Sequence, residues 1–412
     1  MKLEAIFQPF KNNQRNIFGQ IINSLSLTNK RIFALFKNKI MAAFSALGIR
    51  KEYIEALKEL GIKTPTEIQE KTIPILLNSN TDFIGLAQTG TGKTAAFGLP
   101  ILHNINSDLL YTQALILAPT RELVQQIKKQ LFKFTKYTDD KIFVEGVYGG
   151  EKIDIQMKSL KRTTHIIVAT PGRLLDLIER GEVDLKKIST LVLDEADEML
   201  SMGFKQDLNR ILKFTSGTRN TWLFSATMPE EILKIIKIYM AANTPKVAVN
   251  KKDLVNVNIT HQYIKTEVKD KVNLLIKILE RRSADRGIIF CRTKAGVQNL
   301  TAQLKVEGFS VEALEGDMQQ KERDKVMRAF KNGSLQVLIS TDVSARGIDV
   351  DNLAFIIHHQ LPDQLEYYTH RSGRTARAGK TGFSIALIVP NEVQRIHEIQ
   401  KELGIKFIEI SI

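Results

Sequence analysis

The stretch that decides the fold class is Ala87-Gln88-Thr89-Gly90-Thr91-Gly92-Lys93-Thr94. It follows the apolar run 83–86, which is typical of a buried strand, and it precedes an apolar segment that is typical of a helix. Within that segment, Pro100 is expected to kink the helix or to end its regular hydrogen bonding. A strand, a glycine-rich turn and Gly-Lys-Thr at the start of a helix together predict a phosphate-binding loop.

The residue types of this loop suit a nucleotide phosphate. Glycines let backbone N–H groups turn toward one anion, and the helix N-terminus adds unpaired N–H groups and the positive end of its dipole. Lys93 is expected to reach the β- and γ-phosphates, and Thr94 to offer its hydroxyl to Mg²⁺. An ordinary turn is the alternative, which the flanking strand and helix disfavour. The residues expected to contact nucleotide are Gln88, Thr89, Gly90, Thr91, Gly92, Lys93 and Thr94.

The composition narrows the class of protein. The chain has 412 residues, of which 43% are hydrophobic, so two or three well-packed domains are expected. A net charge of +14 favours a polyanionic partner, usually nucleic acid. The single cysteine, Cys291, excludes an internal disulfide framework and fits a reducing compartment, so we expect a cytoplasmic protein. No run is long and apolar enough to span a bilayer, so no membrane is expected among its partners.

Apolar, strand-like runs alternate with helical segments in two sets, which predicts an α/β chain of two domains, each a parallel sheet flanked by helices. We place the first domain at 41–243, a linker at 244–256 and the second domain, which lacks a phosphate loop, at 257–412. The expected strands are 83–86, 114–118, 166–169, 190–193 and 222–224 in the first domain, and 287–291, 311–314, 337–340, 354–358 and 383–389 in the second.

Residues 1–40 differ from the rest of the chain. They contain seven Lys or Arg and one Glu, and they match no motif. Three interpretations compete: an amphipathic targeting segment, a basic RNA-binding arm, or an upstream extension that is absent from the native protein. We expect this basic extension to be loosely ordered or absent, and dispensable for catalysis.

The apolar run 190–193 ends in the acidic segment Asp194-Glu195-Ala196-Asp197. A buried strand that delivers a carboxylate beside a phosphate loop can hold Mg²⁺, so Asp194 is the expected metal ligand. The adjacent Glu195 can then act as a general base on water. An acidic cluster by itself is more often a solvated turn, but the preceding strand and the phosphate loop disfavour that interpretation.

The same three acids and alanine form the motif that gives the DEAD-box RNA helicases their name, and the chain resembles this family over residues 41–390. The resemblance implies two tandem RecA-like domains with the nucleotide site in the cleft between them. It also implies an ATP-dependent RNA helicase, with ATP and Mg²⁺ as cofactors and RNA as partner. Further similar motifs lie at 60–69, 119–123, 149–150, 170–173 and 225–227, and at 289–293, 320–323, 340–349 and 370–377.

The resemblance also implies roles for single residues around the nucleotide. Ile62, Thr64 and Gln69 are expected at the adenine, and Asp349 at the ribose. The family commonly has an aromatic residue at the position of Ile62, which offers no π-face. The amide of Gln69 both donates and accepts, which suits the edge of adenine.

Catalysis is expected to need both domains. Arg374 and Arg377 offer rigid donor forks and would act as arginine fingers on the transferring phosphoryl group. Because they lie on the other domain from Lys93, hydrolysis should require the domains to close. The expected catalytic residues are Lys93, Asp194, Glu195, Arg374 and Arg377, and Ser225 and Thr227 are expected to couple Asp197 to His370. Ser372 and Ala376 replace the family's more frequent Ile and Gly, with little effect expected.

RNA contact is expected to involve phosphates rather than base edges, so binding should be largely independent of sequence. An ATP-gated RNA clamp that assembles complexes is the alternative function, since clamps and helicases share these motifs. A DNA helicase is disfavoured by the match to the RNA-directed family. The residues expected to contact RNA are Arg121, Gly150, Thr170, Gly172, Arg173, Arg292, Gln320, Arg323 and Thr341.

Overall fold

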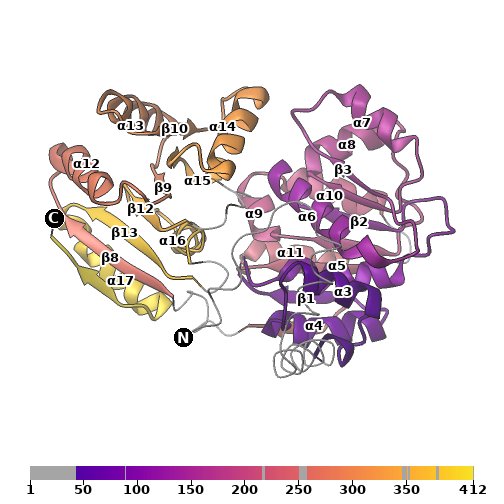
Figure 1. Cartoon of the computed structure of the whole chain (residues 1–412). Helices are drawn as coiled ribbons and strands as arrows, with labels where there is room; N and C mark the ends of the chain where they lie inside the picture. Colours follow the sequence, from indigo (N-terminus) through magenta and orange to yellow (C-terminus); the bar gives the residue numbers. More distant parts are fainter. Residues whose placement is uncertain are drawn as a thin grey trace, which may run out of the picture.

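The computed structural model describes residues 43–88, 90–215, 219–249, 258–345, 350, 353–376 and 380–411. They form two α/β domains that lie beside one another, with the first on the right and the second on the left in Figure 1. The expected extension 1–40 and residues 250–256 of the expected linker lie outside the described residues.

The first domain is built on a seven-stranded sheet of order β3-β4-β2-β5-β6-β1-β7, in which all neighbouring strands are parallel. Its strands are β1 (Phe83–Leu86), β2 (Ala114–Leu117), β3 (Val144–Val147), β4 (Ile166–Ala169), β5 (Thr190–Leu193), β6 (Asn220–Ser225) and β7 (Lys246–Ala248). Its helices are α3 (Lys51–Glu59), α4 (Glu67–Asn78), α5 (Lys93–Asn104), α6 (Arg121–Phe134), α7 (Ile153–Leu160), α8 (Pro171–Glu179), α9 (Ala196–Ser201), α10 (Lys205–Phe214) and α11 (Glu230–Tyr239), with the 3₁₀ turn η2 (Thr135–Tyr137).

The second domain has a seven-stranded parallel sheet of order β10-β11-β9-β12-β13-β8-β14. When the strands of each domain are numbered from one, both sheets have the same order. The strands are β8 (Ile259–Lys265), β9 (Gly287–Phe290), β10 (Val311–Leu314), β11 (Val337–Ser340), β12 (Phe355–His358), β13 (Gly382–Ile388) and β14 (Phe407–Glu409). The helices are α12 (Lys271–Arg281), α13 (Lys294–Val306), α14 (Gln320–Asn332), α15 (Asp342–Ala345), α16 (Leu365–Ser372) and α17 (Val393–Leu403), with the turns η4 (Val268–Asp270) and η5 (Pro390–Glu392).

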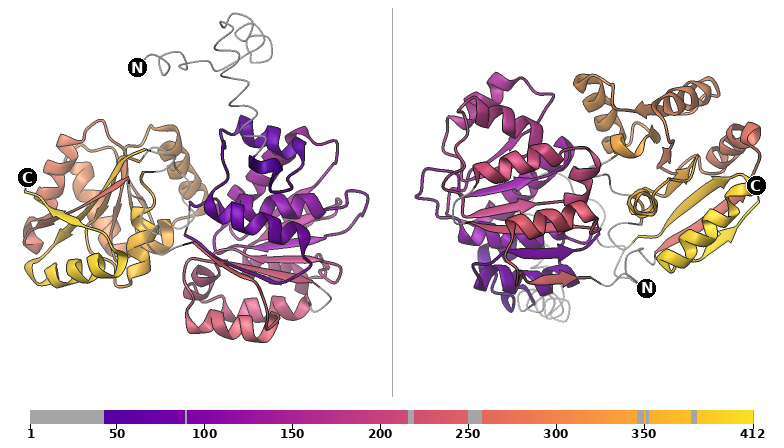
Figure 2. Two further views of the ribbon diagram at one scale, coloured as in Figure 1. Left: turned by 90° about the horizontal axis from the view of Figure 1, so that it is seen from below. Right: turned by 180° about the vertical axis from the view of Figure 1, so that it is seen from behind.

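Helices cover both faces of each sheet (Figure 2), which explains why the central strands are continuous apolar runs. In β2, Leu115 and Leu117 pack into the cluster on one face, whereas Ile116 packs into the cluster on the other. Because all strands of each sheet are parallel, their carboxyl ends lie at the same edge of that sheet. The motifs that follow β1, β2, β4 and β5 are therefore brought to one edge.

The structure contains all ten expected strands within two residues of their predicted limits, and adds β3, β7, β8 and β14. Three of these, β3, β7 and β14, lie at sheet edges, where half-exposed strands have only a weak apolar pattern. The prediction that 244–256 is a linker is wrong for 246–248, because β7 pairs with β1 and belongs to the first sheet.

Pro100 does not end the helix, which was one of the two outcomes expected for it. Helix α5 continues through Pro100 to Asn104. A proline in a helix removes one backbone hydrogen bond, but Phe97, Leu99 and Ile101 of the same helix are buried in the core. Their packing holds the helix together despite the lost bond.

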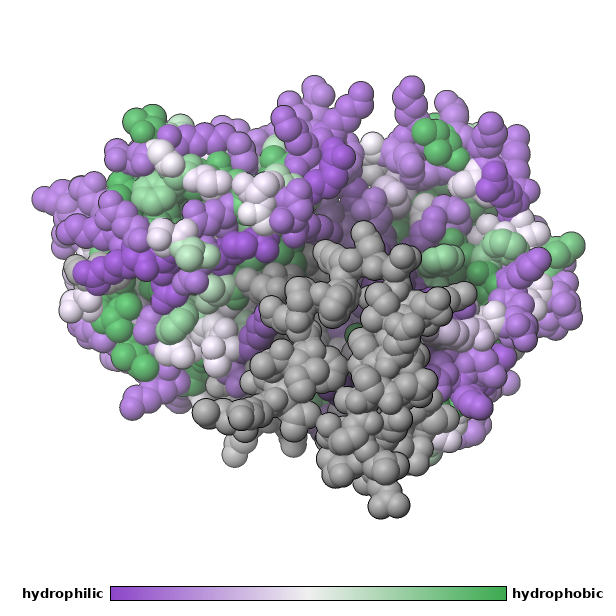
Figure 3. Space-filling model, in the orientation of Figure 1, coloured by the Kyte–Doolittle hydropathy of each residue, from purple (hydrophilic) through white to green (hydrophobic). Residues whose placement is uncertain are grey.

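The face of the molecule drawn in Figure 3 is largely hydrophilic, with hydrophobic residues in small groups over both domains. Within the part of the chain that the structure describes, no helix has the length and apolarity needed to cross a membrane.

Candidate nucleotide and RNA site between the domains

The phosphate-binding loop joins β1 to α5. Gly90 and Gly92 have φ angles of 86° and 93°, in the region that favours glycine. A Cβ atom at Gly92 would lie 2.4 Å from Gln69 Nε2, so the available space also requires glycine there. Lys93 is only 6% exposed, and its Nζ donates to Ala87 O at 3.0 Å. The ammonium group thus lies over the loop, within the region where a phosphate would bind.

Gln69 supports this loop from α4. Its Oε1 accepts a hydrogen bond from the backbone N–H of Thr66, and its Nε2 donates to Gly92 O, both at 3.0 Å. The side chain therefore orients the last glycine of the loop, a role that the sequence did not suggest. Of the other two residues expected at the adenine, Ile62 is half-buried against the hydrophobic core and Thr64 is exposed.

Asp194 and Glu195 follow β5 at the same edge of the sheet. Burial, together with the Glu195 and Asp197 carboxylates, raises the pKa of Asp194 to about 7, although Lys93 and the Glu195 N–H oppose the rise. A buried carboxylate whose charge is not fully compensated suits a bound cation. The described residues contain no group of three or more His, Cys, Asp or Glu that could hold a metal by themselves. Mg²⁺ usually takes one or two carboxylates, water and nucleotide phosphates as ligands, a set to which Asp194 could contribute.

Glu195 has a φ angle of 50°, which is uncommon for a residue with a side chain. It directly precedes α9, and its N–H donates to Asp194 Oδ1 at 3.0 Å. Strained backbone of this kind costs free energy and persists where the surroundings enforce it, often at functional sites. The backbone thus supports a functional role for this acid.

Asp197 is held by the residues after β6. Its Oδ2 accepts hydrogen bonds from Thr227 N at 2.8 Å and Thr227 Oγ1 at 2.9 Å, and its own N–H donates to Ser225 Oγ at 3.3 Å. The expected link between Asp197 and the hydroxyls is therefore present. His370, the other expected member, contacts the next acid along the chain, Glu198.

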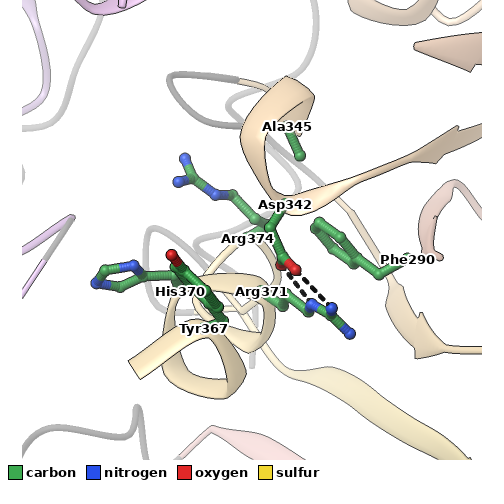
Figure 4. A pocket seen from close by; sticks show the side chains of 7 residues that line it. All are labelled: Phe290, Asp342, Ala345, Tyr367, His370, Arg371 and Arg374. Atoms are coloured by element: carbon green, nitrogen blue, oxygen red, sulfur yellow. Dashed lines mark hydrogen bonds and ion pairs between the residues drawn. The ribbon is translucent and has the colours of Figure 1, made fainter. Parts of the chain in front are cut away.

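In the second domain, a pocket forms where α15 and α16 meet the end of β9 (Figure 4). Arg371 forms a bidentate ion pair with Asp342, at 2.5 and 2.7 Å, inside this pocket. His370 and Arg374 extend away from that pair in Figure 4. His370 lies in the last turn of α16 and contacts the first domain. Arg374, an expected arginine finger, follows the end of the same helix. The pocket is lined by Phe290, Asp342, Ala345, Tyr367, His370, Arg371 and Arg374.

Contacts between polar side chains of the described residues join the domains. His370 Nδ1 lies 2.8 Å from Glu198 Oε1, and Arg323 Nε lies 2.6 Å from Glu122 Oε1. Arg323 also donates through Nη2 to Ser344 O at 2.8 Å, so its buried guanidinium bridges α6, α14 and α15. The sequence did not suggest a role for either acid, although Glu122 lies within the motif at 119–123 and Glu198 directly follows the acidic motif.

Several residues expected to contact RNA meet at this junction. Gly150 has a φ angle of 89°, and a Cβ there would lie 2.2 Å from Arg121 Nη1 and 3.4 Å from Gln320 Oε1. The first domain's Arg121 and the second domain's Gln320 therefore approach the same glycine. That close approach leaves no room for a side chain at this position. A phosphate that approached the backbone there would require glycine for the same reason.

The other expected RNA residues lie at the carboxyl edges of both sheets. Thr170 is buried before α8, next to the exposed Gly172, and Arg173 Nη1 donates to Glu151 O at 3.0 Å. In the second domain, Arg292 is exposed, and Thr341 Oγ1 bonds Ser344 Oγ at 3.1 Å. Thr89, Asp349 and Arg377 lie outside the described residues.

Two family models match the chain. The model for DEAD/DEAH box helicases matches residues 66–235, and the model for the helicase conserved C-terminal domain matches residues 270–379. The fold and site thus define a two-domain helicase. The DEAD-box ATP-dependent RNA helicase CshA of Geobacillus kaustophilus is 42% identical over 362 residues, which cover 88% of this chain and 76% of that protein. The chain belongs to the DEAD-box ATP-dependent RNA helicase family.

The chain is also similar to solved structures of Dbp5 from S. cerevisiae. Dbp5 bound to RNA and ADP BeF3 is 32% identical, with 89% of this chain and 95% of that chain covered, and has a TM-score of 0.82. A Dbp5 variant bound to Nup159, a Gle1 variant, IP6 and ADP is 31% identical, with 88% and 95% covered, and has a TM-score of 0.63. At nearly equal coverage, this chain therefore superposes better on the first of these two Dbp5 structures than on the second.

Proposed function

We propose that the chain uses Mg-ATP to close its two domains on RNA and thereby separates short duplexes locally or remodels RNA–protein complexes. The observation that supports this most directly is the pair of side-chain contacts across the cleft, the ion pair Arg323–Glu122 and the hydrogen bond His370–Glu198. They hold α14 and α16 of the second domain against the first. Arg374, on the C-terminal side of α16, is then directed to the nucleotide of the other domain.

In this proposal the first domain binds the nucleotide. The loop 87–94 surrounds the phosphates, with Lys93 as the charged donor, and Ile62, Thr64 and Gln69 lie at the adenine. Thr94 and Asp194 hold Mg²⁺, which when bound neutralises charge on the phosphate oxygens. Glu195 accepts the proton of the attacking water. Arg374 and Arg377 neutralise the transferring group, and Asp349 contacts the ribose.

RNA binds across the carboxyl edges of both sheets through phosphate contacts. Hydroxyls, glycine backbone and guanidinium groups from both domains contact one strand, and Arg323 mainly joins the domains. The proposed contacts are Arg121, Gly150, Thr170, Gly172, Arg173, Arg292, Gln320, Arg323 and Thr341. Since none of these contacts is proposed to read a base edge, affinity should fall steeply with salt and change little with sequence.

ATP hydrolysis measured with and without RNA tests the closure proposal. We expect RNA to stimulate hydrolysis, and equal turnover without RNA would contradict closure. Glu195→Gln should bind ATP and RNA together but hydrolyse poorly, because the base is lost while Asp194 remains. Glu230→Gln removes one exposed acid from α11 and is the matched control.

Duplex release and the lifetime of the protein on one RNA distinguish the helicase from an ATP-gated clamp. A helicase should release the strand within the time of one ATP hydrolysis. A long-lived complex without strand release would favour the clamp. A strong preference among single-stranded RNAs of equal length, at fixed salt, would contradict phosphate-dominated binding.

A further inference from the structure

Four acids lie close together at the start of α9, and three of them already have proposed roles or defined partners. Asp194 and Glu195 precede the helix, at the proposed metal and water, and Asp197 is bound by Ser225 and Thr227. The fourth, Glu198, lies outside the tetrapeptide that names the family. Its side chain nevertheless faces the second domain.

The contact of Glu198 is well defined. Its Oε1 lies 2.8 Å from His370 Nδ1, and the two side chains are only 6% and 14% exposed. Because a carboxylate only accepts hydrogen bonds, Nδ1 carries a proton and donates the hydrogen bond to Glu198 Oε1. Hydrogen bonds to charged groups are stronger than neutral ones, and shielding from water reduces their screening.

Glu198 is also fixed from within the first domain. Its N–H donates to Asp197 Oδ1 at 3.1 Å, and Ser201 Oγ lies 3.4 Å from its Oε2. The carboxylate is therefore held on the helix that begins directly after Glu195. On the other side, His370 immediately precedes Arg371 in α16, and Arg371 is anchored to Asp342. The hydrogen bond between Glu198 and His370 thus joins α9, which follows the proposed general base, to α16, which precedes Arg374.

We infer that Glu198 is a positioning residue for hydrolysis, which stabilises the closed arrangement by binding His370 across the cleft. It does not touch the reacting atoms; it acts through His370 on the placement of α16 and Arg374. This inference rests on the proposed closure of the domains. The hydrogen bond between Glu198 and His370 is a second, direct link between the domains, in addition to the expected link through Ser225, Thr227 and Asp197.

The test measures ATP hydrolysis by the full chain against RNA concentration at saturating ATP. Glu198→Gln keeps the size of the side chain and removes its charge. We expect it to raise the half-saturating RNA concentration about tenfold, equivalent to about 1.4 kcal/mol of closed-state stabilisation, with a smaller change in kcat. RNA binding can still drive closure at saturation, so the effect should fall mainly on RNA dependence. Glu230→Gln, with the same charge change, should behave as wild type.

A double-mutant cycle separates the pair from a merely structural effect. His370→Gln should raise the half-saturating RNA concentration similarly, and the double variant should be no worse than the worse single variant. An unchanged RNA dependence in Glu198→Gln, or additive losses in the double variant, would overturn the inference. Thermal unfolding of each variant checks folding, and Glu198→Asp, whose shorter carboxylate withdraws from His370, provides a second route to the same answer. A wild-type enzyme that RNA fails to stimulate would count against the proposed closure instead.

Discussion

The two domains share one strand order but use the end of their first strand differently. After β1, a glycine loop leads to Lys93, the first residue of α5. After β8, the turn η4 leads to Lys271, the first residue of α12. Both lysines are therefore buried at topologically equivalent positions.

The contacts of the two amines separate their roles. Lys93 Nζ bonds the carbonyl of Ala87 in its own loop. Lys271 Nζ donates to His359 O at 3.0 Å and Leu387 O at 2.7 Å, which satisfies strand-end carbonyls of its sheet. A shared topology thus provides a lysine for a phosphate only where a glycine loop leaves N–H groups and space for an anion.

Replacing each lysine by an uncharged residue should give the largest difference between the two domains. Lys93→Ala should lower kcat/KM for ATP by about 10²–10³-fold, the effect typical of removing one preorganised donor to a transition state. Its unfolding temperature should change less than that of Lys271→Met, because only one carbonyl loses its donor. Lys271→Met should instead lower the unfolding temperature, because two buried carbonyls lose their donor. Loss of hydrolysis in Lys271→Met at an unchanged unfolding temperature would contradict this division.

The stability of the two domains should also change with pH in opposite directions. Burial lowers the pKa of His261 from 6.5 to about 4, so the second domain loses stability as the pH falls through this window, because only the unfolded chain binds the proton. The raised pKa of Asp194, about 7, has the opposite sign: its contribution is lost as the pH rises from about 4 to 7.

Thermal unfolding at pH 7.5 and pH 5 tests both signs. From pH 7.5 to 5, His261 should cost on the order of 2 kcal/mol. His261→Gln should make the loss on acidification smaller, and Asp194→Asn, in Mg²⁺-free buffer, should make it larger. Identical pH profiles for the two variants would contradict the assignment.

A smaller effect is expected at the adenine, which only the first domain is expected to bind. Ile62→Phe should tighten ATP binding, since aromatic stacking adds roughly 0.5–1.5 kcal/mol beyond the burial of area. Titration with a fluorescent ATP analogue measures this change. Unchanged affinity would show that Ile62 does not face the base.

The smallest effect concerns backbone strain. Among the described residues, only Glu195 in the first domain and Ala376 in the second are non-glycine residues with positive φ, at 50° and 54°. Ala376→Gly should stabilise the second domain by roughly 0.5–1 kcal/mol, because glycine adopts this conformation without a steric cost. Urea unfolding measures the change, and a destabilised variant would contradict it. Little effect was expected at Ala376 because it is small and lies away from the phosphate-facing arginines; its φ angle identifies a cost in stability.

The sequence predicted central strands better than edges. Strands β2 and β4 are buried on both faces and stand out as apolar runs, whereas β7 is three residues long and mostly exposed. Its place in the first sheet follows from pairing with β1, which no local pattern indicates. Pro100 remains helical for a related reason, since tertiary packing outweighs one lost hydrogen bond.

By itself, the sequence determined the class of protein and the residues of the phosphate loop and acidic motif. Their chemistry lies in contiguous residues, where a glycine turn before a lysine, or an apolar strand ending in acids, has one main use. Only the tertiary structure decided that His370 bonds Glu198, that Gln69 braces Gly92, and that Arg323 reaches Glu122, 201 residues away. The first and third pairings depend on where two separately folded sheets place their edges, and the second on how α4 packs beside the phosphate loop. A local pattern of residues specifies neither distance.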